Sequence, residues 1–411
     1  MDTQLNILFV HQNFPAQFVY VAHALKDVPG LKLAVVTHKE NDHVDFLPTA
    51  RYGWEPQRAG RPEHISTNFA LRVSRGRMAA NAMLAIRSQN FVPDVILGHL
   101  GWGETLFAKD VFPDARLIVH AEFYYSASGA DVGFDPEFPF DDRAERRFEL
   151  RAKNAAILAA MIDADRAVAP THWQASRFPA ELQHKIDIVH EGIDTDLIAP
   201  NSNAVFRIGG TGQVFRPGDE VITFVNRNLE PYRGYHIFMR MLPRLLSERP
   251  NAHVIIVGGD AVSYGAAPPQ GKSWKQIFLS EVRDRLPMER VHFVGKIPFA
   301  DFVALMQVSA AHVYLTYPFV LSWSMLQAMS AGAPIIASDT EPVREIIEDG
   351  VNGRLVDFFD IEMLTDRVVD VLENPDTYKP MRSAARATII KKYDLRSICL
   401  PRWLDLLGAL R

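Results

Sequence analysis

The sequence predicts an α/β fold made of two doubly wound halves. Strand and helix patterns alternate along the chain, and the strands read as continuous apolar runs, which is typical of parallel strands buried on both faces. A stretch dense in Gly, Pro, Asn and Ser interrupts the alternation near the middle of the 411 residues. We therefore expect domains at 1–200 and 220–394, a linker at 201–219, and a C-terminal helix at 395–411.

In the first half, each expected strand is a short run rich in Val, Ile and Leu. A helix is expected where apolar residues recur at helical spacing, at Phe18–Lys26. The expected strands are Asn6–His11, Leu31–Thr37, Asp94–Gly98, Arg116–His120, Arg166–Ala169 and Ile186–His190.

The same alternation resumes after the linker. The expected strands are Val221–Val225, His253–Gly258, Val291–Gly295, Ala311–Thr316 and Pro334–Ala337. Helices are expected between them at Gly234–Arg249, Phe299–Val308 and Ser322–Ser330.

Composition excludes several classes of protein. Lys and Arg number 44 against 49 Asp and Glu, and this net charge of −5 argues against nucleic acid as the main partner. The single cysteine, Cys399, excludes an intramolecular disulfide and a cysteine-built zinc site. Neither a secretory leader nor an apolar run of about 18 residues is evident. We expect a soluble, cytoplasmic protein.

Ligands of doubly wound sheets bind at the carboxyl ends of the strands, so residues just after strands are the candidates. Arg227 and Arg233 flank such a turn, and Gly234 opens the next helix. Two guanidiniums beside a helix N-terminus are suited to binding a diphosphate. The alternative is a pair of solvated surface arginines.

The stretch Thr316–Gly332 (TYPFVLSWSMLQAMSAG) also follows a strand. Ser322 or Ser324 is a good N-cap, and we expect the backbone amides of Leu321–Ser324 to be directed toward a ligand. The alternative is an ordinary strand–turn–helix unit with one buried face.

Several motifs then agree in order and spacing with a known family. The chain reads NRNLEPYRG, LQAMSAGAPIIASD and EPVREIIEDGVNGRLV, and earlier HQNFPAQF and VHEGIDTDLIAP. It resembles the retaining nucleotide-sugar glycosyltransferases of family 4, in particular exopolysaccharide-type group 1 members. The resemblance implies a GT-B fold, in which two Rossmann-like domains face each other across a cleft. It also implies that the C-terminal helix at 395–411 crosses back to the first domain. The second domain would bind the donor and the first the acceptor.

The resemblance also implies site residues. Arg227 and Arg233 match the basic pair that holds the donor diphosphate, and both count as catalytic. Gln327 falls on the glutamate that binds the ribose, and Phe319 falls on the glutamate that contacts the donor sugar. The full expected donor set is Arg227, Arg233, Phe319, Leu321, Ser322, Trp323, Ser324 and Gln327. Because Phe319 accepts no hydrogen bond, a weakly active or non-catalytic nucleotide-sugar-binding protein stays open, as does a GT-B nucleotide-sugar epimerase.

In the first half, the resemblance implies that His120 lies beside donor sugar and acceptor as a third catalytic residue. A structural histidine is the alternative. His11, Asn13, Gly101 and Gly103 are the expected acceptor-side residues, although the glycines could equally serve a tight turn.

The expected reaction is retaining hexosyl transfer from a UDP- or GDP-sugar to a saccharide or lipid-linked glycan, as in polysaccharide biosynthesis. We expect no metal and no cofactor other than the nucleotide sugar as co-substrate. The segment Arg143–Lys153 (RAERRFELRAK) has acidic residues at helical spacing, which favours a salt-bridged solvated face. Weak peripheral contact with an anionic membrane is the alternative.

Overall fold

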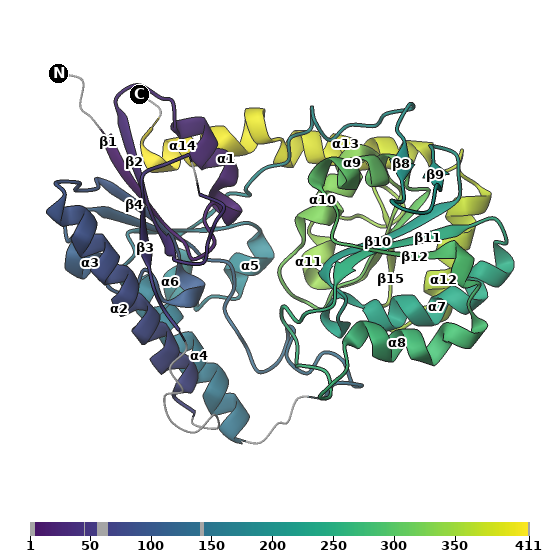
Figure 1. The fold of residues 1–411 in the computed structure, drawn as a ribbon, viewed down its shortest axis with the longest axis horizontal. Coiled ribbons are helices and arrows are strands. Elements are labelled where there is room, and N and C mark those ends of the chain that lie inside the picture. The colour runs from purple at the N-terminus through teal and green to yellow at the C-terminus, as the bar shows by residue number, and fades with distance from the viewer. Residues whose placement is uncertain (1–4, 45, 56–64, 140–143, 410–411) are drawn as a thin grey trace. The chain divides into compact units, whose positions relative to one another are not determined.

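A computed structural model describes residues 5–44, 46–55, 65–139 and 144–409. The chain divides into two compact units. Unit 1 is Met1–Gly192 together with Leu395–Arg411, and unit 2 is Ile193–Asp394. Each unit is an α/β domain with a parallel sheet between helical layers (Figure 1). This confirms the predicted fold class.

The sheet of unit 1 has seven strands in the order β3-β2-β1-β4-β5-β6-β7. All neighbouring strands in it are parallel. The strands are β1 Leu5–Val10, β2 Leu31–His38, β3 Thr49–Tyr52, β4 Val95–His99, β5 Arg116–His120, β6 Arg166–Ala169 and β7 Ile186–Ile188. The central strands β1, β4 and β5 are buried, because helices cover both faces of the sheet.

The two faces of this sheet have separate cores. One core contains residues of the long helices α2 and α4, and the other contains residues of α1 and α14, as the two sides of the sheet in Figure 1 show. The helices are α1 Val19–Leu25, α2 Thr67–Ser88, α3 Ala108–Val111, α4 Ala144–Asp163, α5 His172–Ser176, α6 Ala180–Gln183 and α14 Leu400–Leu407.

The sheet of unit 2 has six parallel strands in the order β12-β11-β10-β13-β14-β15. They are β10 Val221–Asn228, β11 His253–Gly259, β12 Val291–Gly295, β13 Ala311–Tyr314, β14 Ile335–Ser338 and β15 Arg354–Val356. The helices are α7 Tyr235–Glu248, α8 Trp274–Val282, α9 Phe299–Val308, α10 Trp323–Ala331, α11 Glu341–Arg344, α12 Ile361–Glu373 and α13 Lys379–Tyr393.

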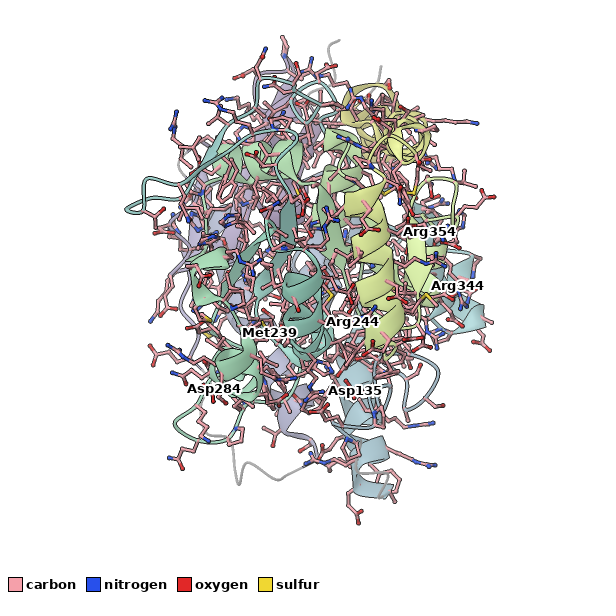
Figure 2. The ribbon with its side chains drawn as sticks, turned by 90° about the vertical axis from the view of Figure 1, so that its right-hand side faces the viewer. Asp135, Met239, Arg244, Asp284, Arg344 and Arg354 are labelled. Carbon is pink, nitrogen blue, oxygen red and sulfur yellow. The ribbon has the colours of Figure 1, made fainter. Side chains whose placement is uncertain are left out.

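Helices α9, α10 and α13 cover one face of this sheet, and α7, α8 and α12 cover the other (Figure 1). On the second face, Arg244 of α7, labelled in Figure 2, forms ion pairs with Glu362 and Asp366 of α12. These pairs link neighbouring helices at the surface, where solvent screening leaves each pair little effect on stability.

The segment 201–219, expected to be a linker, lies inside unit 2. It forms the short antiparallel pair β8 Phe206–Arg207 and β9 Val214–Phe215. Phe206 and Phe215 are buried in the core of unit 2, and this burial holds the segment to the domain. The two units instead divide at Gly192 and at Asp394.

The C-terminal segment groups with unit 1. Trp403 of α14 donates from Nε1 to the carbonyl oxygen of His190, 3.1 Å away, and Arg116 of β5 donates to the carbonyl oxygen of Leu406. In the described part of the chain, no helix combines the length and apolar character needed to cross a bilayer.

One buried histidine makes unit 2 sensitive to acid. His312 of β13 is fully buried, and its Nδ1 lies 2.8 Å from Oγ1 of Thr223. Burial lowers the pKa of His312 to about 3. Between pH 3 and 6.5 the unfolded chain binds a proton that the folded unit does not, so stability falls as the pH falls through this range.

At pH 5 we expect the free energy of unfolding of unit 2 to be about 2 kcal/mol lower than at pH 7 from His312 alone. Amide hydrogen exchange of β13 and β14 at the two pH values measures this difference. The variant His312→Asn cannot titrate and should show a correspondingly smaller pH dependence. An unchanged pH dependence in that variant would contradict the assignment.

Candidate functional site

The two predicted arginines of unit 2 lie at the carboxyl end of β10 but in different environments. Arg227 is exposed near the end of the strand. Arg233 lies on the one-turn helix Pro231–Arg233 and is only 5 % exposed. The alternative of a pair of solvated surface arginines is therefore wrong for Arg233, because its guanidinium is buried in the domain.

The guanidinium of Arg233 connects two neighbouring strand ends. Its Nη1 donates to Oγ1 of Thr316 at 2.7 Å and to the carbonyl oxygen of Val320 at 2.9 Å. Its Cζ lies 5.1 Å from the ring centre of Tyr264 and 5.8 Å from that of Phe319. Burial acts to lower the pKa of Arg233, but Tyr314, Tyr264 and Glu230 outweigh it and raise the pKa overall. Arg233 is thus a permanent positive charge at this edge of the sheet.

Gly234 allows the chain to enter α7 directly after Arg233. Its φ is +67°, in the left-handed region that favours glycine. A Cβ at this position would lie 2.3 Å from Cβ of Leu315. The glycine of the motif therefore permits the close approach of α7 to the segment after β13.

Two further residues at this edge of the sheet were not predicted from the sequence. Glu230 is buried, and its carboxylate accepts hydrogen bonds from the backbone N–H groups of Ser263, Tyr264 and Gly265. It thereby fixes the loop after β11, although it stands only three residues before Arg233 in the same motif. Lys296 is exposed directly after β12, and its position after a strand was a signal that could have identified it.

The backbone amides at the start of α10 were expected to be directed toward a ligand, but the structure shows other partners for two of them. Ser322 caps the helix, and its Oγ accepts from the N–H of Ser324 at 3.3 Å. The N–H of Ser322 donates to the hydroxyl of Tyr314 at 2.9 Å. Two of the amides expected to bind a ligand are thus bonded within the domain, because the cap and the tyrosine satisfy them first.

Phe319 and Gln327, which the resemblance aligns with two glutamates of the family, are both buried. Phe319 packs edge-on against Tyr232, with ring centres 5.2 Å apart, and lies 5.0 Å from the ring centre of Tyr264. Gln327 lies on α10 and is 6 % exposed. Leu321 and Trp323 are half-buried beside them. Apart from the two arginines, the predicted donor residues thus lie on one segment, from Phe319 to Gln327.

In unit 1, His120 belongs to a buried cluster of four histidines and two glutamates at the carboxyl ends of the strands. The ring of His120 stacks on that of His99 with centres 5.4 Å apart, and His99 contacts His11 edge-on at 5.3 Å. Nε2 of His120 lies 2.9 Å from Oε1 of Glu191. The members of this histidine cluster are His11, His99, His120, His190, Glu122 and Glu191.

Local hydrogen bonds fix the orientation of three of these rings. Nδ1 of His11, His99 and His190 accepts from the backbone N–H two residues further on, at 2.9, 3.1 and 3.0 Å. In a neutral imidazole the proton then resides on Nε2. Nε2 of His99 lies 3.4 Å from Glu122, and Nε2 of His190 lies 3.6 Å from Glu191. In sequence, this motif requires a histidine followed two positions later by a residue other than proline, because proline has no N–H to donate.

The charges in the cluster follow from burial and pairing. Burial raises the pKa of Glu122, but the neighbouring imidazoles of His99 and His120 outweigh it, and the pKa is about 2. Burial also opposes ionisation of Glu191, yet His190 and His120 bring its pKa below the usual range. Burial lowers the pKa of His11 and of His190. At neutral pH the two carboxylates are therefore ionised and these two histidines neutral.

Because the Glu191 carboxylate only accepts hydrogen bonds, Nε2 of His120 must donate to it. Nδ1 of His120 is buried and has no hydrogen-bond partner among the described residues. His120 therefore offers one unused ring nitrogen in a buried polar environment. Among the residues that the structure describes, no three His, Cys, Asp or Glu side chains are grouped so as to hold a metal ion.

The other acceptor-side candidates lie near this cluster. Asn13 is exposed, and its backbone N–H donates to Nδ1 of His11. Gly101 supplies the N–H that caps His99. Gly103 has a φ of +105°, and a Cβ there would lie 2.3 Å from the carbonyl oxygen of Arg72. The tight-turn interpretation therefore explains Gly103, because α2 packs directly on this turn.

Residues 144–153 of the predicted basic segment form the start of α4, and Arg143 lies outside the described residues. Arg146 pairs with Glu149 at 2.7 Å on the exposed face, as a salt-bridged solvated helix predicts. Lys153 differs, because it is half-buried and its Nζ lies 3.2 Å from the ring centre of Tyr125.

Two parallel α/β units with candidate residues at their strand ends define the GT-B class of fold. Comparison with known proteins places the chain within that class. Residues 29–198 match the family described as "Glycosyl transferase family 4 group", and residues 212–388 match "Glycosyl transferases group 1". The chain therefore belongs to the family 4, group 1 glycosyltransferases.

Curated relatives include D-inositol 3-phosphate glycosyltransferases. The one from Mycolicibacterium smegmatis is 27% identical over 242 residues, which is 55% of this chain and 49% of the relative. That from Mycobacterium marinum is 27% identical over 179 residues, or 43% of this chain and 35% of the relative. The chain thus spans half or less of the length of these relatives.

Solved structures resemble the chain over nearly its whole length. Anabaena Alr3699/HepE in complex with UDP has a TM-score of 0.68 at 18% identity, covering 99% of this chain and 100% of that one. A sucrose-phosphate synthase from Thermosynechococcus elongatus has a TM-score of 0.70 at 15% identity, and the match covers 98% of this chain and 100% of that one. At such identities the likeness shows the fold.

Proposed function

We propose that this protein transfers a sugar from a nucleoside-diphosphate donor to an acceptor. The observation that carries the proposal is the set of cations at the carboxyl edge of the unit 2 sheet, within the matched group 1 domain. Arg227 and Lys296 are exposed there, and Arg233 is a fixed buried charge. Developing charge on a diphosphate leaving group is what such cations stabilise.

In this proposal the donor is a UDP- or GDP-sugar. The similar fold of Anabaena Alr3699/HepE, solved in complex with UDP, supports a UDP-sugar. The buried Nδ1 of His120 would accept a hydrogen bond from a hydroxyl group of donor or acceptor. We further propose a cytoplasmic enzyme that retains the anomeric configuration without a metal and uses a saccharide or lipid-linked glycan as acceptor. The resemblance of the motifs to those of retaining members of the family is the basis of these finer points.

A thermal-shift screen against UDP, GDP and their sugars tests donor binding. A ligand that binds only the native state at 100 times its Kd stabilises it by about 2.7 kcal/mol, so the melting temperature should rise measurably. Release of nucleoside diphosphate only with a suitable acceptor then tests transfer. No shift with any nucleotide would refute the proposal.

A second candidate is a protein that binds nucleotide sugars without turning them over. The specific observation in its favour is Phe319, buried between Tyr232 and Tyr264 where the family has a sugar-binding glutamate. This candidate predicts a thermal shift with nucleotide sugars but no release of nucleoside diphosphate. Conversion of the sugar without any acceptor would instead indicate an epimerase.

A further inference from the structure

A cavity of about 140 Å³ lies at the amino ends of the strands of unit 2, the edge of the sheet opposite to Arg227 and Arg233. Its walls come from the segment before β10, the connection from α9 to β13, the residue before β14, the end of α12 and the start of α13. All of these walls belong to unit 2, so the cavity is a feature of one folded domain. The donor residues described above do not line it.

Much of the wall is apolar and rigid. The side chains of Val308, Val371 and Leu372 are buried and line the cavity. Three prolines, whose fixed φ limits movement of the backbone, complete this part of the wall: Pro217, Pro334 and Pro375. An apolar cavity of about 150 Å³ is large enough for benzene, so a side chain of a few carbon atoms fits a space of this size.

One guanidinium in the wall has no anionic partner. Arg382 is half-buried in the first turn of α13, and its Nε donates to the carbonyl oxygen of Gly332 at 2.5 Å. Among the described residues, no carboxylate pairs with Arg382, and its two Nη groups have no hydrogen-bond partner. Burial lowers the pKa of this guanidinium, and no neighbouring charge offsets the effect. A carboxylate that enters the cavity would therefore find a fixed cation with two unused donors.

One carboxylate in the wall likewise has no cationic partner. Glu220 is bound by Arg249, whose Nε donates to its Oε2 at 3.1 Å, so the charge of Glu220 is compensated. Asp219 is exposed, and its Oδ2 accepts from the backbone N–H of Arg216 at 2.7 Å. No Lys or Arg in the described ranges forms an ion pair with Asp219. The cavity thus has one uncompensated charge of each sign in its wall.

The end of α12 adds further acceptors. Pro375 stands four residues after Val371 and has no N–H, so it cannot continue the hydrogen bonds of the helix. Within the part of the chain that the structure describes, no N–H donates to the carbonyl oxygens of Val371 and Leu372. Such carbonyl groups carry the partial negative charge of a helix C-terminus and attract a cation. The hydroxyl of Tyr378 donates to Asp370 and holds this helix end beside the start of α13.

We propose that this cavity binds a free α-amino acid with an apolar side chain. The carboxylate would accept from the guanidinium of Arg382, and the ammonium group would donate toward Asp219 and the end of α12. The side chain would lie against the apolar wall. A zwitterion complements both uncompensated charges, whereas a simple carboxylate or a phosphate complements only Arg382. The inference goes beyond the proposed function and does not depend on it.

The test uses the full chain and leucine as the probe. Three further molecules each lack one part of leucine: glycine lacks the apolar side chain, 4-methylpentanoate lacks the ammonium group, and isoamylamine lacks the carboxylate. All four are titrated at pH 7 and constant ionic strength. We expect leucine to raise the melting temperature to a plateau, and each of the others to need at least about tenfold more for the same shift. A response to glycine or to 4-methylpentanoate equal to that of leucine would overturn the proposal.

Matched variants locate the effect. Asp219→Asn and Arg382→Met each remove one charge and should need about 10- to 100-fold more leucine for the same shift. Lys379→Met removes an exposed cation from the same turn of α13 that does not line the cavity, and should respond as wild type does. Because Asp219 is exposed, Asp219→Asn also provides the test if Arg382→Met does not fold. Equal leucine responses of wild type and Asp219→Asn would refute the assignment.

A second readout places the bound leucine in the cavity. In ¹³C-methyl NMR spectra, the signals of Val308, Val371 and Leu372 should shift with the same dependence on leucine concentration as the melting temperature. Ala310→Leu adds three carbon atoms to the cavity wall and should abolish both responses without any change of charge. A rise in melting temperature with these three methyl signals unchanged would show that leucine binds elsewhere, and the proposal would be wrong.

Discussion

Replacing Arg233 by alanine is expected to lower the free energy of unfolding of unit 2 by about 3 kcal/mol and to weaken nucleoside-diphosphate binding by about 10- to 150-fold. Both effects arise from the same guanidinium. Its removal leaves Thr316 and the carbonyl oxygen of Val320 without their buried donor. It also removes a permanent charge from the edge of the sheet where the diphosphate would bind.

The loss should be larger in turnover than in ground-state binding, because negative charge grows on the leaving group as the bond breaks. Arg233→Lys should recover part of the affinity but not the full set of hydrogen bonds, since an ammonium group lacks the planar fork of a guanidinium. Denaturant unfolding and calorimetric titration with UDP or GDP measure the two effects separately.

Arg227 provides the matched control, because it is an arginine at the same strand end but exposed. Arg227→Ala should weaken diphosphate binding with a change in stability of at most about 0.5 kcal/mol. If Arg233→Ala left both stability and affinity at wild-type values, neither the structural nor the binding role of Arg233 would stand.

The sequence was sufficient for most of the fold because buried parallel strands have a strong signature. Arg116–His120 and Val291–Gly295 were predicted with the bounds that the structure has, since each apolar run is bounded by polar or turn residues. The edge strands β3 and β15 were not predicted. They have only four and three residues and are partly exposed, so neither shows a continuous apolar run.

The linker shows the limit of composition as a guide. Gly, Pro, Asn and Ser indicate irregular backbone, and 201–219 is largely irregular. They do not indicate whether such backbone is attached to a domain. Here two phenylalanines among the polar residues, Phe206 and Phe215, determine that it is attached.

The environment of the site depends on contacts that no local pattern contains. The local sequence predicts a loop position for Arg233, but its hydrogen-bond partners lie 81 to 87 residues further along the chain. His120 could be singled out at a strand end, whereas its neighbour His99 is brought to it by the parallel register of β4 and β5, which pairs these two residues. Such juxtapositions become predictable only when strand order and register are known.

Replacing Glu191 by glutamine is expected to lower kcat about tenfold with little change in the KM for the donor. Glutamine keeps an acceptor for Nε2 of His120 at the position of Oε1 but removes the negative charge. The difference between a charged and a neutral hydrogen bond is about 1.4 kcal/mol, which corresponds to roughly a factor of ten in rate. Glu191 would act here as a positioning residue, through His120 and His190, without touching the substrate.

Glu191→Leu should have a larger effect, because it removes the acceptor of the Nε2–H group of His120 in a buried environment. ¹⁵N spectra of the imidazoles provide a readout that a purely structural role would not change. In wild type and Glu191→Gln, His120 should carry its proton on Nε2, and in Glu191→Leu the proton should shift toward Nδ1. The control Glu181→Gln, on the exposed face of α6, should match wild type in rate and spectra. A Glu191→Leu enzyme with wild-type kcat and an unchanged His120 tautomer would show that the hydrogen bond from His120 to Glu191 does not position His120 for the reaction.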